Sequence, residues 1–300
     1  MSYEEFVELV ERRLRENFSG KRDIYIRTAL KNNGGQRKGI VIREPDLNIS
    51  PTIYLEEYFK RYQSGSTLEE IEQQIEELYQ HVKVTHRWEG AFLADYENVR
   101  PRIVYRVVGC RNNGAYLEGV PYVSFLDLAV VFYVMLDLGE EDDMVFMPIS
   151  NEHLQLWNVT RDDIYGEACK NTEKLLPAEF APMQTVICEM FGEEELGAEE
   201  QAEEDVYILT NSSRNFGAAA ILYHSCLKHI GEYLGEDYYV MPSSIHEVII
   251  LPVSMAPSWK ELDFIVSEMN ETQLKSEDVL SDGAYLYCRE KDQLMLSEIL

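Results

Sequence analysis

The chain has 300 residues, 45% of them hydrophobic, which is enough for substantial buried cores and for about two domains. Its strongest apolar run, Leu128 to Leu136, is far shorter than the roughly 20 residues of a membrane-spanning helix. The net charge of −27 is uneven: residues 1–110 carry −1 and residues 111–300 carry −26, which argues against nucleic-acid binding by the second part.

The N-terminus and the cysteines indicate a cytoplasmic protein. The opening sequence MSYEEFVELV is acidic where a signal peptide is basic, and no apolar core follows it. The five cysteines are odd in number and form no C-x-x-C pair, which argues against a disulfide framework and a compact zinc site. We therefore expect a reducing compartment, no metal and no cofactor.

The first part, residues 1–101, is predicted to be a small α+β domain of helix, hairpin, helix and helix. Ser and Thr caps with an acidic residue three positions later predict helices beginning at Ser2 and Thr67. Ser50-Pro51 predicts a further helix between them. Residues 23–30 and 39–43 flank the turn sequence N-N-G-G, which predicts the hairpin.

The second part, residues 102–300, is predicted to be a larger, acidic α+β domain with an antiparallel or mixed sheet. Its first half is predicted to contain strands at 103–108, 123–136 and 144–149 and helices at 151–156 and 161–176. The segment 192–205 holds eight acidic residues and is predicted to be solvated. It would join two related sub-modules, 102–191 and 205–300.

The C-terminal sub-module is predicted to have the element order βαββαβ. The predicted strands are 206–210, 238–241, 247–251 and 284–288, and the predicted helices are 218–234 and 259–269. This order is that of the split-βαβ, ferredoxin-like motif.

Two segments of the second part are similar to each other. Val104-Tyr105 is followed by R-N-N-G-A at 111–115, and Val206-Tyr207 is followed by R-N-F-G-A at 214–218. A strand, a polar turn and a glycine where a helix begins explain both copies. A duplicated unit and a chance match remain alternatives.

Several longer motifs carry a resemblance to a known family. They are K-N-N-G-G at 31–35, I-S-P-T-I-Y-L-E-E-Y at 49–58, F-L-D-L-A-V-V-F-Y at 125–133, Y-I-L-T-N at 207–211 and M-P-S-S-I-H-E-V-I at 241–249. Over most of its length the chain resembles an uncharacterised domain family of anaerobic gut Firmicutes. The second part also resembles, more distantly, a bacillus cytosolic family of unknown function. These resemblances imply a bacterial, intracellular protein and supply no catalytic residues.

The densest polar cluster is Met241 to Glu247 (M-P-S-S-I-H-E). In a hydrolase, Ser243 or Ser244 would be the nucleophile and His246 its base. Glu247 would orient that base. Neighbours on an extended chain point to opposite faces, however, and no G-x-S-x-G elbow is present. We therefore favour a turn shaped by proline and serine, with the hydrolase as the alternative.

A small-molecule site, if there is one, is expected where strand ends meet turns in the second part, because loops on a rigid sheet hold ligand-binding groups. The site requires the 211–217 and 242–247 turns to lie at the same end of the sheet. The candidate residues are Arg214, Asn215, Ser243, Ser244 and His246.

The predicted helix 218–234 contains two histidines and a cysteine. Cys226 and His229 share a face and have the spacing of a pair of metal ligands, whereas His224 points elsewhere. The apolar stripe of this helix places Cys226 in the core. We therefore expect a structural helix and no metal site.

The hairpin 21–43 is strongly basic, with seven bases against Asp23 and a net charge of +6. The candidate basic surface consists of Arg27, Lys31, Arg37, Lys38 and Arg43. Three interpretations compete: a solvated edge protected from aggregation, docking onto the acidic second part, and nucleic-acid contact. The negative field of the whole chain argues against tight nucleic-acid binding.

The sequence as a whole favours a non-catalytic intracellular binding or regulatory protein with an acidic interaction surface. Such a surface suits a basic protein partner, because opposite charges speed encounter. We expect no membrane association. The hydrolase and nucleic-acid interpretations are the alternatives.

Overall fold

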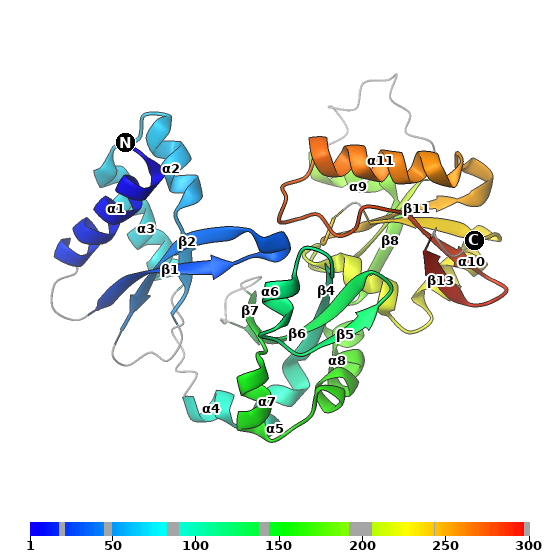
Figure 1. The fold of residues 1–300 in the computed structure, drawn as a ribbon, viewed down its shortest axis with the longest axis horizontal. Helices are drawn as coiled ribbons and strands as arrows, with labels where there is room; N and C mark the ends of the chain where they lie inside the picture. Colours follow the sequence, from blue (N-terminus) through cyan, green and yellow to red (C-terminus); the bar gives the residue numbers. More distant parts are fainter. Residues whose placement is uncertain are drawn as a thin grey trace. The chain divides into compact units, whose positions relative to one another are not determined.

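The computed structural model describes residues 1–17, 22–44, 50–82, 90–137, 144–191, 206–242 and 244–296 (Figure 1). The chain forms two compact units. The first consists of Met1–Arg100 with Met135–Met147, and the second of Pro101–Val134 with Pro148–Leu300. Both helices and antiparallel sheets are present, so the protein is α+β as predicted.

The first unit contains a three-stranded antiparallel sheet in the order β1-β2-β3. Its elements are α1 (Tyr3–Asn17), β1 (Asp23–Leu30), the 3-10 turn η1 (Asn32–Gly34), β2 (Gln36–Arg43), β3 (Thr52–Tyr54), α2 (Glu56–Gln63), α3 (Leu68–Val82), α4 (Gly90–Ala94) and α5 (Tyr96–Val99). One hydrophobic core joins side chains of α1, α2 and α3 to one face of the sheet. The order in this unit is thus a helix, a hairpin, a short third strand and then further helices.

The capping boxes that predicted α1 and α3 form as expected. The Ser2 N–H donates to the Glu5 carboxylate at 2.7 Å, and the Glu5 N–H donates to the Ser2 hydroxyl at 3.2 Å. Thr67 and Glu70 exchange the same two bonds at the start of α3. These bonds satisfy backbone amides that a helix leaves without partners in its first turn.

The helix predicted to begin at Ser50 is wrong in its first turn. Residues Thr52–Tyr54 instead form β3, and α2 begins only at Glu56. The edge of β2 offers hydrogen-bonding groups to Thr52–Tyr54, and Gly39 permits the approach: a Cβ there would lie 2.4 Å from the methyl carbon of Thr52. Sheet pairing therefore overrides the local helix signal.

The next sheet has four strands, in which β6 pairs antiparallel with β4 and β5 and also pairs with β7; the end of β6 from Met135 and β7 as far as Met147 are counted with the first unit and the rest with the second. The elements of this part of the chain are β4 (Ile103–Gly109), α6 (Gly114–Leu117), β5 (Tyr122–Phe125), β6 (Leu128–Asp137), β7 (Met144–Pro148), α7 (Asn151–Trp157) and α8 (Arg161–Leu175), preceded by the short η2 (Arg100–Arg102). The single strand predicted at 123–136 is divided into β5 and β6 by a turn in which Leu126 has a φ of 53°.

Helix α8 covers the free edge of β4. The Tyr105 N–H donates to the Thr172 hydroxyl at 3.0 Å, and the Asn171 side-chain amide donates to the Ile103 carbonyl at 3.1 Å. Two polar side chains thus form hydrogen bonds with backbone N–H and C=O groups of β4 that could otherwise pair with another strand.

The rest of the second unit is a six-stranded antiparallel sheet in the order β13-β12-β10-β11-β9-β8. Its strands are β8 (Ala178–Pro182), β9 (Tyr207–Asn211), β10 (Tyr238–Met241), β11 (Val248–Pro252), β12 (Tyr285–Cys288) and β13 (Gln293–Leu296). Its helical segments are α9 (Met183–Phe191), η3 (Gly217–Leu222), α10 (Cys226–Leu234), η4 (Val253–Met255) and α11 (Trp259–Thr272). Helix α9 lies on the same side of the sheet as α11 (Figure 1).

The ferredoxin-like prediction is wrong in its sheet order. The six predicted elements occur in sequence, but β12 pairs with β10, whereas the last strand of a ferredoxin-like sheet lies beside the first. The place beside β9 is taken by β8, a strand that was not predicted. The predicted continuous helix 218–234 is also wrong, because it breaks into η3 and α10 around Ser225, whose φ is 58°.

The acidic segment 192–205, and its role between two sub-modules, lies outside the described residues. No helix among the residues that are described has both the length and the apolar character needed to cross a bilayer.

Candidate functional site

The two turns that were predicted to form a site lie at the same end of the six-stranded sheet. The antiparallel pairing of β9 with β11 brings the end of one strand beside the start of the other. The Thr210 hydroxyl donates to the His246 carbonyl at 2.8 Å, and the Phe216 N–H donates to Nδ1 of His246 at 3.3 Å. The geometric requirement of the predicted site is therefore met, although Ser243 lies outside the described residues.

The Ser244 hydroxyl serves the turn itself. It accepts hydrogen bonds from the backbone N–H groups of His246 at 2.9 Å and Glu247 at 3.3 Å, and it donates to the Glu247 carboxylate at 2.8 Å. The residue is only 2% exposed. The His246 ring instead packs against the Phe216 ring, and its Nε2 lies 3.5 Å from Oδ1 of Asp278. Ser244 and His246 are thus not arranged as nucleophile and base.

Arg214 and Asn215 take part in the turn in different ways. The guanidinium of Arg214 forms ion pairs with Glu179 of β8 and Glu189 of α9. The Asn215 carbonyl accepts a hydrogen bond from the Asn211 side chain at 3.1 Å. Arg214 therefore ties the turn to the edge of the sheet and does not join His246.

A buried arginine beneath the turn was not predicted. Arg106, in the middle of β4, is 7% exposed, and its guanidinium lies 3.5 Å from the centre of the Phe216 ring and 4.3 Å from that of Tyr133. The Tyr133 hydroxyl lies 2.9 Å from that of Tyr116. Burial lowers the pKa of Arg106 to about 10, so it stays charged at neutral pH. In the sequence, the indication of this buried arginine was a single charged residue inside the apolar run I-V-Y-R-V-V.

An aromatic groove lies between β8 and α10 and has a volume of about 380 Å³. We call it the β8–α10 groove. The Phe180 and Tyr207 rings stack beneath it at 4.9 Å, and the Tyr233 ring meets both edge-on at 5.8 and 6.0 Å. Tyr233 nonetheless remains 68% exposed. The residues lining the groove are Glu173, Pro177, Ala178, Phe180, Tyr223, His224, Cys226, His229, Ile230 and Tyr233.

The polar groups of the β8–α10 groove include two histidines and a cysteine, as the sequence indicated. Cys226 and His229 both line it, but within the described part of the chain no three potential metal ligands come together. Burial raises the pKa of the Cys226 thiol to about 11, which keeps it protonated and weakly nucleophilic at neutral pH. Glu173 accepts a hydrogen bond from the His224 backbone N–H.

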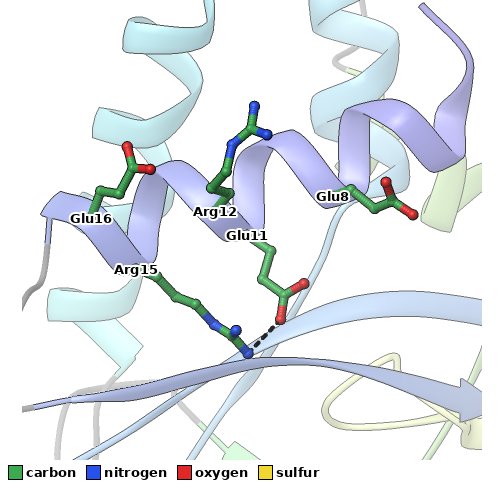
Figure 2. Close-up of a pocket in the computed structure, with 5 residues that line it drawn as sticks. All are labelled: Glu8, Glu11, Arg12, Arg15 and Glu16. Atoms are coloured by element: carbon green, nitrogen blue, oxygen red, sulfur yellow. Dashed lines mark ion pairs between the residues drawn. The ribbon is translucent and has the colours of Figure 1, made fainter.

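A second concavity, on α1, is lined only by charged side chains. Figure 2 shows these residues, which are Glu8, Glu11, Arg12, Arg15 and Glu16. Arg15 pairs with Glu11 at 2.8 Å and donates from Nε to the Ile24 carbonyl of β1 at 2.7 Å. The bond to Ile24 holds the helix to the sheet, whereas the pair with Glu11 lies within α1, and the absence of an apolar side chain from the lining indicates a solvated helix face.

The basic residues of the hairpin are divided between the two faces of the first sheet. Side chains alternate between the two faces along each strand, and residues paired across the ladder share a face. The register therefore places Arg27, Arg37 and Arg43 on one face. Lys38 lies on the other face, with its ammonium group 3.9 Å from Glu4. Lys31 lies 3.9 Å above the Tyr54 ring. The solvated-edge, docking and nucleic-acid interpretations of this surface stay predictions.

Comparison with known proteins places the chain in a family without adding an activity. No curated protein and no solved structure matches it. A family model described as a family of unknown function (DUF5688) matches residues 3–289, nearly the whole chain. This confirms the resemblance to an uncharacterised domain family, whereas the gut Firmicutes host and the more distant bacillus relative stay predictions. The chain belongs to the family of unknown function DUF5688.

Proposed function

We propose that this protein is a non-catalytic binding protein and that the β8–α10 groove is its ligand site. The observation that carries the proposal is the exposed Tyr233 ring, which completes an aromatic cluster with Phe180 and Tyr207. A volume of about 380 Å³ falls within the range of about 300 to 1,000 Å³ that small-ligand pockets occupy. Aromatic side chains of this kind supply contact area at low entropic cost.

The 211–217 turn is hydrogen-bonded to one residue of the groove lining. The Ser212 N–H donates to the Pro177 carbonyl at 2.9 Å, which joins the start of the 211–217 turn to the groove lining. Arg214 and Asn215 follow directly, but the Arg214 guanidinium pairs with Glu179, which lies on the sheet face opposite Ala178 and Phe180, so we propose that both residues fix the turn and do not contact the ligand. Ser244 and His246 then act by fixing the shape of that turn.

Two features support binding in preference to hydrolysis. The Ser244 hydroxyl is fully engaged within its own turn, and its contact with His246 runs through the backbone and not the ring. The Cys226 thiol is protonated at neutral pH.

All five cysteines are free thiols, which supports the proposed cytoplasmic setting in a bacterium.

The proposal is tested by ligand-observed NMR with a panel of neutral aromatic fragments such as indole, p-cresol and 2-naphthol. We expect saturation transfer to several fragments, lost in Tyr233→Ala and kept in Tyr25→Ala, a tyrosine of the first unit that is also exposed. Both side chains are exposed, so neither change is expected to disturb the core. If no fragment binds, or if Tyr233→Ala binds them as well as the wild type, the groove is not the ligand site.

A further inference from the structure

Strand β8 presents backbone groups that no other strand of the described residues uses. The Met183 N–H donates to the Val206 carbonyl at 2.8 Å, and the Ser212 N–H donates to the Pro177 carbonyl at 2.9 Å. In an antiparallel ladder the bonded residues alternate, so Ala178 and Phe180 direct their N–H and C=O groups away from β9. Within the described residues β8 is the last strand on this side of the sheet.

This edge differs from the edge of the other sheet in the same unit. The free edge of β4 is closed by side chains of α8, with Thr172 and Asn171 bonded to its backbone. The sequence of β8, A-E-F-A-P, carries no lysine, and the proline that removes an outward N–H, Pro182, stands only at the end of the strand, beyond Ala178 and Phe180. An extended peptide of a few residues fits such an edge.

The β8–α10 groove runs along this same edge, since Pro177, Ala178 and Phe180 belong to its lining. A strand added beside β8 would point alternate side chains to opposite faces of the sheet. One set would enter the aromatic groove beneath Tyr233. The other set would lie on the face of Glu179, whose carboxylate, like that of Glu189 on α9, is 3.4 Å or less from the Arg214 guanidinium. The two faces therefore select different side chains.

Charge indicates which residues suit the second face. Residues 111–300 hold 10 basic and 36 acidic residues, and the second face places the two carboxylates of Glu179 and Glu189 against the single guanidinium of Arg214. Resting on the proposed function, we propose that the ligand of the groove is an extended segment of a partner protein. This segment adds to β8 as a further strand, with apolar side chains in the groove alternating with Lys or Arg on the acidic face.

The test uses fluorescence anisotropy with the full chain and a short fluorescein-labelled peptide that alternates Lys with Phe and Val. A peptide of the same composition without the alternation is the control probe. Ala178→Pro removes one outward N–H while leaving the ladder to β9 intact, and proline is tolerated at such edge positions. Ala178→Ser keeps the N–H and is the matched control variant.

We expect the alternating peptide to bind and the control peptide to bind more weakly. Ala178→Pro should weaken binding by about tenfold, the effect of losing one backbone hydrogen bond, and Ala178→Ser should not. Hydrogen exchange of the wild type provides a measurement that needs no variant: the Ala178 and Phe180 amides should become protected when the peptide is added.

The remaining outcomes separate this inference from the proposed function. One outcome is that fragment binding depends on Tyr233 while peptide binding is unchanged by Ala178→Pro and leaves the Ala178 and Phe180 amides unprotected. That outcome overturns strand addition and leaves the groove as a ligand site. A failure of fragments and peptides alike overturns both. A dimer of the chain alone in light scattering that Ala178→Pro abolishes would show that a second copy occupies the edge, which overturns the proposed partner.

Discussion

Two glycines in the second unit begin helical segments at corresponding positions but have different surroundings. Gly114 begins α6 and Gly217 begins η3, in the two similar segments that follow β4 and β9. A Cβ on Gly114 would meet no atom within 4 Å. A Cβ on Gly217 would lie 2.1 Å from the Thr210 hydroxyl and 2.7 Å from the His246 carbonyl. The second glycine is therefore required by the close approach of the two turns.

This contrast predicts opposite effects of one substitution. Gly217→Ala should lower the free energy of unfolding by about 1–3 kcal/mol, because the added carbon forces packed backbone apart. Gly114→Ala should leave stability unchanged or raise it by up to about 1 kcal/mol, because it restricts the unfolded chain. Urea denaturation of both variants measures the difference. Equal midpoints would show that the two turns do not depend on the close contact at Gly217.

The candidate site was only partly predictable from single residues. The 211–217 and 242–247 turns were identified because proline, serine and glycine mark turns locally, and the β9–β11 pairing brings them together. Arg106 was missed because its role depends on Phe216 and Tyr133, which come close only in the folded chain. The groove was missed for the same reason: Phe180 belongs to an unpredicted strand and stacks on Tyr207 from another.

At the scale of elements, helix starts marked by a capping box were predicted well, whereas the start at Ser50 and the sheet order were not. Ser and Thr caps with an acidic residue three positions later also occur at Thr160 and Ser258, and they form capping boxes at the starts of α8 and α11 as at α1 and α3, because each box depends on residues only three apart. Strands β3 and β8 were not predicted, because a short strand is stabilised by a neighbour distant in sequence. The position of β12 beside β10 is a non-local choice of the same kind.

One helix start is predicted to respond to pH. In the capping box of α7, the Ser150 N–H donates to Nδ1 of His153 at 2.9 Å, and this bond requires the neutral ring. Burial lowers the pKa of His153 below its ordinary value of 6.5, with Glu152 acting in the opposite sense. Between the two pKa values the unfolded chain binds more protons than the folded one, so stability present above pH 6.5 is lost as pH falls through the folded pKa.

The substitution His153→Gln distinguishes the effect of protonating His153 from the effects of protonating other groups on the free energy of unfolding. Glutamine keeps a side-chain acceptor at the third position of the capping box and does not titrate. The wild type should lose about 1 kcal/mol more than His153→Gln between neutral and mildly acidic pH, the usual value of an N-terminal cap. Urea midpoints of both proteins across that range provide the measurement. The same pH dependence in both would show that His153 is not responsible.

At the scale of the whole molecule, charge is divided unevenly along the chain. The net charge is −1 for residues 1–110 and −26 for residues 111–300. Ion pairs within the second unit, such as those of Arg214 with Glu179 and Glu189, offset only part of this excess. Most of the acidic side chains therefore repel one another across the folded surface, and the compact state brings them closer than the unfolded chain does.

Salt should therefore stabilise the protein. Raising NaCl from about 10 to 150 mM shortens the screening length from about 30 to 8 Å, so repulsion between distant carboxylates weakens while close ion pairs are affected less. We expect the melting temperature in calorimetry to rise by a few degrees, equally with KCl. Neutralising Glu268 and Glu271, which are exposed near the C-terminal end of α11, should raise the melting temperature at low salt and reduce the further gain from NaCl. A melting temperature that falls as salt is added would mean that specific ion pairs outweigh the general repulsion. The acidic surface would then not destabilise the folded state.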